Sequence, residues 1–489
     1  MLGQALAAFL AAMAPMEVGS KSCAPCHAAV VRAYQASPMS RTSGHTGDKL
    51  ESFASAEFVT PAYKVDFAGS ALSLEWFLGS GRLGRSYLFS RNGFLFQSPL
   101  SYYRAQQKWD KSPGFRGMDF TRPVESACLQ CHASRLQPVA GTLNGFRNPP
   151  FLENGVSCER CHGPGSDHVR AGGKGGIVNP SKLAPPRRDS VCAQCHLTGA
   201  ARLARAGPKA YTPGALLSDS IAVFTWSSTD SGLNATSHFE KLSRSACAQA
   251  SGERLWCGTC HDPHGKPITL NTKCAACHQP AQCQRGPDCA SCHMPKSQVH
   301  SMDHVAFTDH SIPRRPAPPS EPLRTGLVPF WKGSADAREE ALAYSIAAQT
   351  EAALRPRAFE MLVDAERRWP KDVAVLAQLA QFYDAMGDEE RAMELSERIL
   401  ALDPGHLAAT INLGTYRVKR GQVAEAIALW ERALAKAPGS TGTRLNLAIA
   451  KFQSGDRAGA EAQLLRALEH DPGNASARRM LEEIRSRSR

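Results

Sequence analysis

Long apolar runs are absent from this sequence of 489 residues, and none approaches the roughly twenty residues that a helix needs to cross a membrane. We therefore expect no transmembrane span. Arg-rich tracts and nucleic-acid-binding motifs are also absent, so no nucleic-acid partner is expected, although the formal net charge is +12. Almost all of this charge lies before residue 336, because the remainder holds 22 Lys and Arg against 23 Asp and Glu.

Cysteine occurs almost entirely in one pattern. The sequence contains seven copies of Cys-x-x-Cys-His, which use fourteen of the sixteen cysteines. In a c-type haem site, two thiols form thioethers to the porphyrin and the adjacent histidine binds the iron. The pattern therefore predicts seven covalently bound haem c groups. The copies are Cys23/Cys26/His27, Cys128/Cys131/His132, Cys158/Cys161/His162, Cys192/Cys195/His196, Cys257/Cys260/His261, Cys274/Cys277/His278 and Cys289/Cys292/His293.

Other uses of paired cysteines fit this pattern less well. A zinc site takes Cys-x-x-Cys pairs but does not require a histidine directly after the second cysteine. A thioredoxin-like dithiol needs a strand–helix context, which these segments lack, and a disulfide framework would not place histidine at one fixed offset. The two remaining cysteines, Cys247 and Cys283, either bridge in an oxidising compartment or stay free, and we slightly favour the bridge.

The number of histidines matches the number of predicted haems. Of sixteen histidines, seven are the proximal ligands of the motifs, and two, His406 and His470, lie in a later domain. The other seven suffice to give every iron a second axial ligand, and we expect about four or five of them to be distal ligands. His264 is too close to His261 to cross the same haem, so it is expected to reach a neighbouring one. The candidate distal ligands are His45, His168, His238, His264, His300, His304 and His310.

Axial ligation decides the expected chemistry. A haem with two histidine ligands has no open position and passes electrons, whereas a five-coordinate haem binds a small molecule and reacts with it. Seven haems would bring about fourteen propionates, and we expect the excess of basic residues in the haem region to pair with these carboxylates.

The N-terminus resembles a secretory signal peptide over residues 1–16. Met1 to Ala14 is apolar and rich in alanine, but no Lys or Arg precedes Lys21, and Pro15 directly follows the small residues of the cleavage-like sequence. The alternative is a short core helix. The signal peptide predicts a periplasmic or extracellular protein.

The predicted haem region extends over residues 17–310 and is expected to be loop-rich and mainly α-helical, with a small β insert at about 46–125. Because so loop-rich a segment buries little ordinary core, haem is expected to supply the missing apolar contacts, and the haem-free chain is not expected to fold stably. Residues 311–335 form a proline-rich linker.

Within the β insert, Asn92-Gly93 predicts a hairpin, since this dipeptide suits a two-residue turn with positive φ. Flanking strands are expected at 59–67 and 72–78. The aromatic side chains of the insert are expected to fill a local core rather than to cover a haem; they are Trp76, Phe77, Tyr87, Phe89, Phe94 and Phe96.

Residues 336–489 contain an internal repeat. A proline recurs every 34 residues, at Pro370, Pro404, Pro438 and Pro472, and glycines and alanines keep the same period. This is the tetratricopeptide pattern of paired antiparallel helices. Full repeats are expected at 373–406, 407–440 and 441–474, after a degenerate one at about 339–372 and before a polar capping helix at 475–485. Such arrays bind partner proteins, or serve only as scaffolds or dimerising units.

The chain resembles multihaem c-type cytochromes of the cytochrome c-554-like class that carry C-terminal tetratricopeptide repeats. The resemblance rests on Gly155-Val-Ser-Cys-Glu-Arg-Cys-His-Gly-Pro-Gly, on Cys257-Gly-Thr-Cys-His-Asp-Pro-His-Gly, and on Cys289-Ala-Ser-Cys-His-Met-Pro-Lys with Thr308-Asp-His310. It implies covalent haem and export from the cytoplasm. The class is related to multihaem nitrite reductases and hydroxylamine oxidoreductases, but no Cys-x-x-Cys-Lys is present, so the substrate haem of the pentahaem nitrite reductases has no counterpart.

Three functions are compatible with these patterns. The first is an extracytoplasmic electron carrier whose repeats dock a redox partner protein, and the histidine number favours it. The second is a reductase or oxidase of a small nitrogen or sulfur compound at one open haem. The third is a self-associating subunit of a polymeric haem filament.

Overall fold

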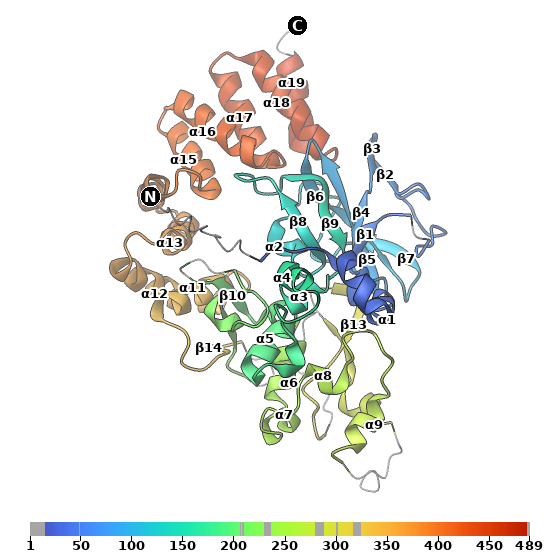
Figure 1. The fold of residues 1–489 in the computed structure, drawn as a ribbon. Helices are drawn as coiled ribbons and strands as arrows, with labels where there is room; N and C mark the ends of the chain where they lie inside the picture. The colour runs from blue at the N-terminus through green and yellow to red at the C-terminus, as the bar shows by residue number, and fades with distance from the viewer. Residues whose placement is uncertain are drawn as a thin grey trace, which may run out of the picture.

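The computed structural model describes residues 15–47, 49–205, 207, 210–228, 236–278, 288–299, 302–315 and 324–486. Figure 1 shows a β-rich region in blue and cyan, a region of short helices and strands in green and yellow, and a row of longer helices in orange and red. We call residues 15–315 the N-terminal part and residues 337–486 the helical array. Most of the predicted signal peptide lies outside the described residues. In the described ranges, no helix is long and apolar enough to span a bilayer.

A five-stranded antiparallel sheet with strand order β1-β4-β5-β6-β7 organises the first region. Helix α1 (Ala24–Gln35) precedes it, and the hairpin of β2 (Lys64–Phe67) and β3 (Ser70–Ser73) lies beside it (Figure 1). The strands of the sheet are β1 (Ser43–His45), β4 (Trp76–Leu78), β5 (Gly84–Arg91), β6 (Phe94–Tyr103) and β7 (Lys108–Lys111).

The predicted hairpin is confirmed. Asn92 (φ 53°) and Gly93 (φ 82°) form the turn between β5 and β6, with the positive φ values that a two-residue hairpin loop needs. The predicted aromatic core is also confirmed, because Tyr87, Phe89 and Phe96 are completely buried and pack with one another and with neighbouring rings. The sheet therefore has a hydrophobic core of its own.

Short elements make up the rest of the N-terminal part. The strands pair as β8 with β9, β12 with β13, and β10 with β11 and β14. The elements are α2 (Ser126–Leu129), β8 (Ala133–Pro138), β9 (Phe146–Asn154), α3 (Glu159–His162), α4 (Ser166–Arg170), α5 (Pro185–His196), β10 (Ala201–Ala204), β11 (Ile221–Trp226), α6 (His238–Arg244), α7 (Ala246–Ala250), α8 (Cys257–Cys260), α9 (Leu270–Ala275), α10 (Cys289–His293), β12 (Lys296–Val299), β13 (Met302–Thr308) and β14 (Leu327–Pro329).

The mainly α-helical character expected for this part is not confirmed. Most motif helices are single turns, as in α2, α3 and α8, and strands occur throughout the region. These strands were not predicted from the sequence because β8–β9 and β10–β11 are short and lack a regular alternation of apolar and polar residues. Their pairing depends on tertiary contacts.

The helical array follows the predicted 34-residue period. Its helices pair as α11–α12, α13–α14, α15–α16 and α17–α18, followed by the single helix α19 (Figure 1). The bounds are α11 (Ala337–Ala347), α12 (Arg355–Arg368), α13 (Val373–Met386), α14 (Glu389–Leu402), α15 (Leu407–Lys419), α16 (Val423–Lys436), α17 (Thr441–Gln453), α18 (Arg457–His470) and α19 (Ala475–Ser486).

Local sequence explains why these helices begin, end and pack where they do. Asp372 and Asp388 cap α13 and α14 by accepting hydrogen bonds from backbone N–H groups of the first turn. Each repeated proline lies two residues after the last residue of the second helix of a pair, where it cannot continue the helix. The small residues at one phase of the repeat, Ala392, Ala426 and Ala460, are completely buried and let neighbouring helices approach.

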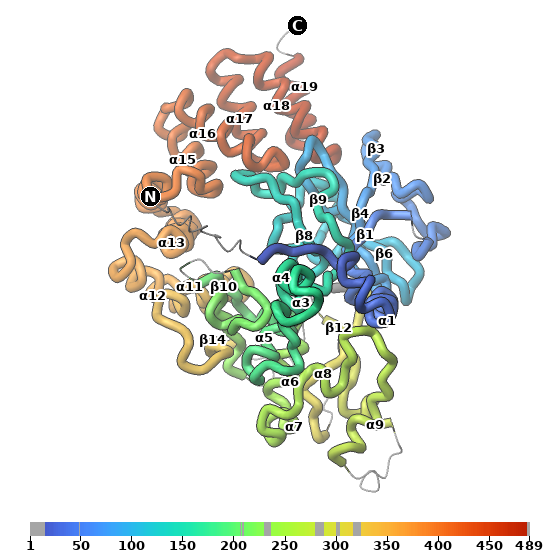
Figure 2. The backbone as a smooth tube through the Cα atoms, viewed as in Figure 1, coloured from blue at the N-terminus to red at the C-terminus, as the bar shows by residue number. Residues whose placement is uncertain are grey.

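The array is attached to the N-terminal part at two places, and Figure 2 shows it curving beside that part. At the start of the array, β14 lies within the predicted linker and pairs with β11, while Nη1 of Arg205 donates to both carboxylate oxygens of the buried Glu339 at 2.8 and 2.9 Å. Farther along the array, at the end of α16, the backbone N–H of Leu143 donates to the carbonyl of Lys436 at 3.1 Å.

Candidate functional site

The seven Cys-x-x-Cys-His motifs converge in the N-terminal part. All fourteen motif cysteines lie among the described residues, as does Cys247. Cys283 lies outside the described residues, so its bridge to Cys247 stays a prediction. Thiols of different motifs lie near enough to shift one another's pKa in three pairs, which are Cys23–Cys158, Cys131–Cys195 and Cys192–Cys257.

Weaker electrostatic interactions extend these contacts to other motifs. The Cys161 thiol interacts with Cys192, and Cys260 interacts with Cys277. The Cys274 thiol interacts with Cys289, which joins the last two motifs. Burial raises the pKa of the Cys161 thiol to about 11. Thiols of successive motifs therefore influence one another electrostatically.

Not every predicted attachment residue shares this burial. In the first, second, sixth and seventh motifs, one cysteine of each pair is exposed; these are Cys26, Cys128, Cys277 and Cys292. The histidines of the first, fourth, fifth and sixth motifs are exposed as well; these are His27, His196, His261 and His278. Figure 1 shows α9, which carries part of the sixth motif, at the edge of the molecule.

Three motif histidines each lie opposite a candidate distal histidine. The ring centroids are 6.3 Å apart for His27 and His168, 6.1 Å for His162 and His264, and 6.2 Å for His261 and His310, with interplanar angles of 14°, 18° and 28°. Two imidazole nitrogens bound to one metal at about 2 Å each place the ring centroids about 6 Å apart. The three pairs therefore have the spacing of two axial ligands on one iron.

Backbone carbonyls fix the orientation of several of these rings. Nδ1 of His162 lies 2.7 Å from the carbonyl of Val178, and Nδ1 of His168 lies 2.8 Å from that of Gly175. His310 makes the same contact with the carbonyl of Thr308, and His293 with that of Pro313. Because a carbonyl only accepts, Nδ1 carries the proton and the Nε2 lone pair is available to a metal.

A fourth pair, His196 and His238, is perpendicular. The ring centroids are 5.6 Å apart at 88°, whereas His238 and His310 are only 4.7 Å apart, which is too close for two ligands on opposite sides of one metal. This spacing assigns His238 to His196 and leaves His310 to His261.

Burial keeps these imidazoles neutral. It lowers the pKa of His238 to about 3, and it also lowers the pKa values of His132, His162, His196, His261 and His310. A neutral imidazole is the form that binds a metal ion. The donor set therefore fits haem iron, to which the protein contributes two nitrogens. Within the described residues, no group of three or more His, Cys, Asp and Glu side chains could hold a metal ion by itself.

The remaining distal candidates have other neighbours. Nε2 of His304 lies 2.8 Å from a carboxylate oxygen of Asp110, and its ring contacts that of Tyr103. His45 is exposed, with its ring 6.0 Å from that of Trp76. His300 lies outside the described residues.

The proximal histidines of three motifs are thus left without an assigned partner. They are His132, His278 and His293 of the second, sixth and seventh motifs. His132 is buried and His293 is oriented by a carbonyl, whereas the exposed ring of His278 stacks on no other ring of the described residues. The axial partners of these three motifs stay predictions.

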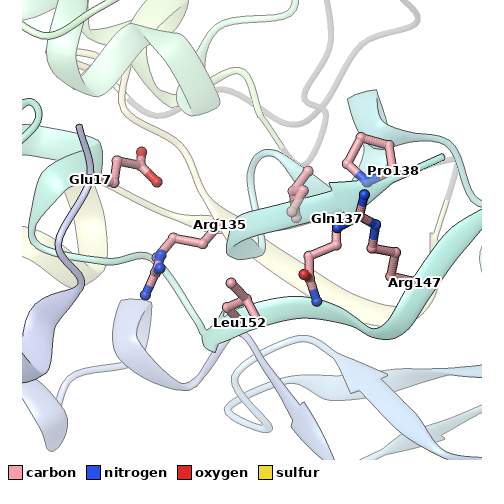
Figure 3. A pocket seen from close by; sticks show the side chains of 7 residues that line it. Glu17, Arg135, Gln137, Pro138, Arg147 and Leu152 are labelled. Carbon is pink, nitrogen blue, oxygen red and sulfur yellow. The ribbon is translucent and has the colours of Figure 1, made fainter. Parts of the chain in front are cut away.

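Two features of this region could not be predicted from the sequence. The orienting carbonyls, such as that of Val178, belong to loops that only the tertiary fold brings to the histidines. A groove of about 390 Å³ also lies on β8 and β9, and Figure 3 shows Arg135 and Arg147 on its two sides, with Gln137 and Leu152 between them. Its two guanidinium groups suit carboxylate ligands.

Comparison with known proteins supports both parts of the chain. Residues 103–163, which include the second and third motifs, match the family model of cytochrome c554 and c-prime, and residues 417–484 match a tetratricopeptide repeat model. The chain combines a cytochrome c-like domain with tetratricopeptide repeats. No curated protein matches it.

Similar solved structures include several of MamA. A MamA double mutant from strain RS-1 and MamA from residue 41 to its end from Desulfovibrio magneticus RS-1 are each 21% identical over 32% of this chain and 86% of their own, with a TM-score of 0.29. Another MamA crystal structure is 18% identical over 30% of this chain and 80% of its own, with a TM-score of 0.28.

Proposed function

We propose that this protein is an extracytoplasmic electron carrier that holds seven c-type haems and docks a redox partner through its repeats. The observation that carries the proposal is the set of nearly parallel histidine pairs about 6 Å apart. Haem, when bound, supplies one-electron redox chemistry. The protein supplies attachment, axial ligands and exclusion of water from the central sites.

Each residue type has one role in this proposal. The fourteen motif cysteines hold the porphyrins by thioethers, and the seven motif histidines are proximal ligands. His168, His264, His238 and His310 are the distal ligands of the first, third, fourth and fifth motifs. Arg135 and Arg147 are candidates to neutralise propionates, as two guanidinium groups on one groove would do.

The thiol contacts set the proposed order of the sites. Electrostatic influence links motif one to motif three, motif three to motif four, and motif four to both motif two and motif five. Motifs five, six and seven are linked in the same way through Cys260–Cys277 and Cys274–Cys289. These links support a continuous electron path with one side branch at the second motif.

The exposed attachment cysteines lie at the ends of this path. Cys26 belongs to the first motif, at one end of the series, and Cys128 to the second, at the tip of the side branch. Cys277, His278 and Cys292 belong to the last two motifs, at the other end. Electrons enter and leave a carrier through sites that a partner can approach, so these ends are the proposed points of exchange.

The partner and the compartment belong to the same proposal. Tetratricopeptide arrays present extended surfaces to other proteins, and the array lies beside the haem motifs rather than apart from them (Figure 1). The motif count and the signal-like residues 1–16 support a periplasmic or extracellular location.

Three measurements on the purified protein test the proposal. Intact-mass analysis and the pyridine haemochrome should give seven haems per chain, and electron paramagnetic resonance of the oxidised protein should show low-spin iron throughout. A colourless protein with the bare peptide mass would refute it. One full equivalent of high-spin iron would instead favour the reductase or oxidase, and particles that grow with concentration would favour the filament.

A further inference from the structure

A cavity of about 200 Å³ lies where the β5–β6 turn meets the helical array, at the second attachment between the two parts. Residues from both parts line it. Arg91, Asn92 and Phe94 come from the turn, and the array contributes Pro438, Arg444, Arg466, Glu469 and His470. It is remote in sequence from every haem motif.

Positive charge exceeds negative charge in this cavity. Three guanidinium groups, those of Arg91, Arg444 and Arg466, accompany the single carboxylate of Glu469. No arginine of the three forms an ion pair within the described residues. Burial and the like charge of Arg466 lower the pKa of Arg444, and the carboxylate of Glu469 opposes this shift. With His470 neutral, the three guanidinium groups and the one carboxylate leave an excess of two positive charges in the lining.

Two buried nitrogen atoms of residues that line the cavity have no hydrogen-bond partner in the described residues. They are Nη1 of Arg91 and Nδ1 of His470, and His470 is only 3% exposed. Buried polar groups in folded proteins are nearly always hydrogen-bonded, so an orphaned pair at one cavity points to a missing ligand or ion. Arg444 is held in place by hydrogen bonds to the carbonyl of Pro438 at 2.9 Å and to Gln463 at 3.0 Å.

We propose that this cavity binds a doubly charged tetrahedral oxyanion, either free as phosphate or sulfate or as the terminal phosphoryl group of a larger molecule. A dianion matches the excess of two positive charges, and guanidinium groups recognise such oxyanions by paired hydrogen bonds. The volume holds a tetrahedral anion with a few waters, since one water occupies about 30 Å³.

The position of the site links anion binding to the arrangement of the two parts. Arg91 belongs to the N-terminal part, whereas Arg444 and Arg466 belong to the array, so one anion joins both. A ligand that binds only the docked arrangement stabilises it in proportion to its concentration and affinity. The anion therefore regulates how firmly the array is held against the cytochrome part.

Titration of the full-length holoprotein with inorganic phosphate tests this proposal. Calorimetry and thermal unfolding are measured at constant ionic strength, with chloride as the reference anion and with sulfate and glycerol phosphate as further ligands. Arg91→Gln and Arg466→Gln should each weaken binding about tenfold, the loss of one charge-assisted contact. The matched control is Arg420→Gln, which changes an exposed arginine of the array outside the cavity and should leave binding unchanged.

Each outcome of these titrations either supports or overturns the anion site. Saturable binding that Arg91→Gln weakens and Arg91→Lys partly restores supports the site, and tighter binding of glycerol phosphate than of phosphate identifies a phosphoryl group as the ligand. Phosphate that binds no better than chloride, or equal losses in Arg91→Gln and Arg420→Gln, would overturn it. The haem spectrum and circular dichroism of each variant establish that it is folded, and the haem content tests the electron carrier separately.

Discussion

The helical array and the N-terminal part bury their polar groups in different ways. In the array, side chains such as Asp372 and Asp388 satisfy the helix ends, and the core is alanine and leucine. In the N-terminal part, by contrast, Nδ1 of the motif histidine His132 and Nδ1 of His238 are buried without a hydrogen-bond partner, and thiols of different motifs lie near each other. The motif region thus contains sites for an additional group, whereas in the array the unpartnered Nδ1 of His470 belongs to a residue of the cavity shared with the N-terminal part.

Removal of haem should show this difference most strongly. A full-length chain produced without haem attachment should lose the cooperative unfolding of residues 126–315, because the short elements there bury little apolar surface of their own. The array should keep its helical signal and its own melting transition. Circular dichroism and hydrogen exchange measure both, with the holoprotein as reference. Native-like cooperative melting of the whole haem-free chain would contradict the contrast.

Loss of one distal histidine should have the next largest effect. His168→Ala and His264→Ala should each convert about one of the seven irons to the high-spin state while all haems stay attached, since an axial ligand is removed but the thioethers remain. Electron paramagnetic resonance and the pyridine haemochrome measure the two quantities.

His304→Ala is the matched control for these variants. Because Nε2 of His304 contacts Asp110, this change should leave the spin state unaltered. A high-spin signal from His304→Ala, or none from His168→Ala, would mean that the ring pairs do not correspond to axial ligands.

A core substitution in the array should act on the array alone. Leu379→Ala, at a completely buried position, should lower the free energy of unfolding of the array by about 2–5 kcal/mol. The exposed Leu402→Ala should change it by less than about 0.5 kcal/mol. Chemical denaturation followed by circular dichroism measures both, and the haem absorbance should not change. Simultaneous loss of haem absorbance in Leu379→Ala would show that the two parts unfold as one unit.

The smallest expected effect on stability comes from the contact between Asp110 of β7 and His304 of β13. Although burial opposes its ionisation, hydrogen bonds from Lys108, from the Lys111 backbone and from His304 lower the pKa of Asp110 to about 2. A lowered pKa stabilises the folded state above the unfolded value of about 4. This stabilisation is lost as the pH falls toward 2.

Asp110→Asn should therefore reduce the melting temperature slightly at neutral pH and have no effect near pH 2. Asp364→Asn, at an exposed carboxylate of the array, is the control. Thermal melts between pH 2 and 7 measure the difference between the two variants. A penalty for Asp110→Asn that is constant across this range would rule out the charged contact.

Features that depend on neighbouring residues could be predicted from the sequence. The 34-residue period indicated the helices of the array, since each turn and each cap is local, and Asn92-Gly93 indicated its hairpin for the same reason. The seven Cys-x-x-Cys-His motifs were likewise visible by spacing alone, and their role in haem attachment stays part of the proposal.

Features that depend on distant residues could not be predicted. His27 lies opposite His168, and Glu159 accepts hydrogen bonds from the backbone of Val18 and Gly19, across more than a hundred residues in each case. No local pattern encodes such pairings, because they follow from how loops close around the motifs. The oxyanion cavity is similar, since Arg91 and His470 share no sequence neighbourhood.

Differences in exposure among the seven motifs also could not be predicted from the sequence. Cys26, Cys292 and His278 occupy the same motif positions as the partly buried Cys161 and His132, yet they are exposed. Identical spacing fixes the local turn but not what packs around it. Burial is set by neighbours from other parts of the chain, so only the tertiary structure separates central motifs from peripheral ones.

The two attachments of the array have a mechanical consequence. Arg205–Glu339 at the start of the array and Leu143–Lys436 at the end of α16 fix the span that the helices α11 to α16 must cover. Because both ends of this stretch are fixed, the helices between them can neither straighten nor curve further. An inserted repeat would have to bulge outward, so the number of repeats between the anchor points is matched to the width of the domain beneath.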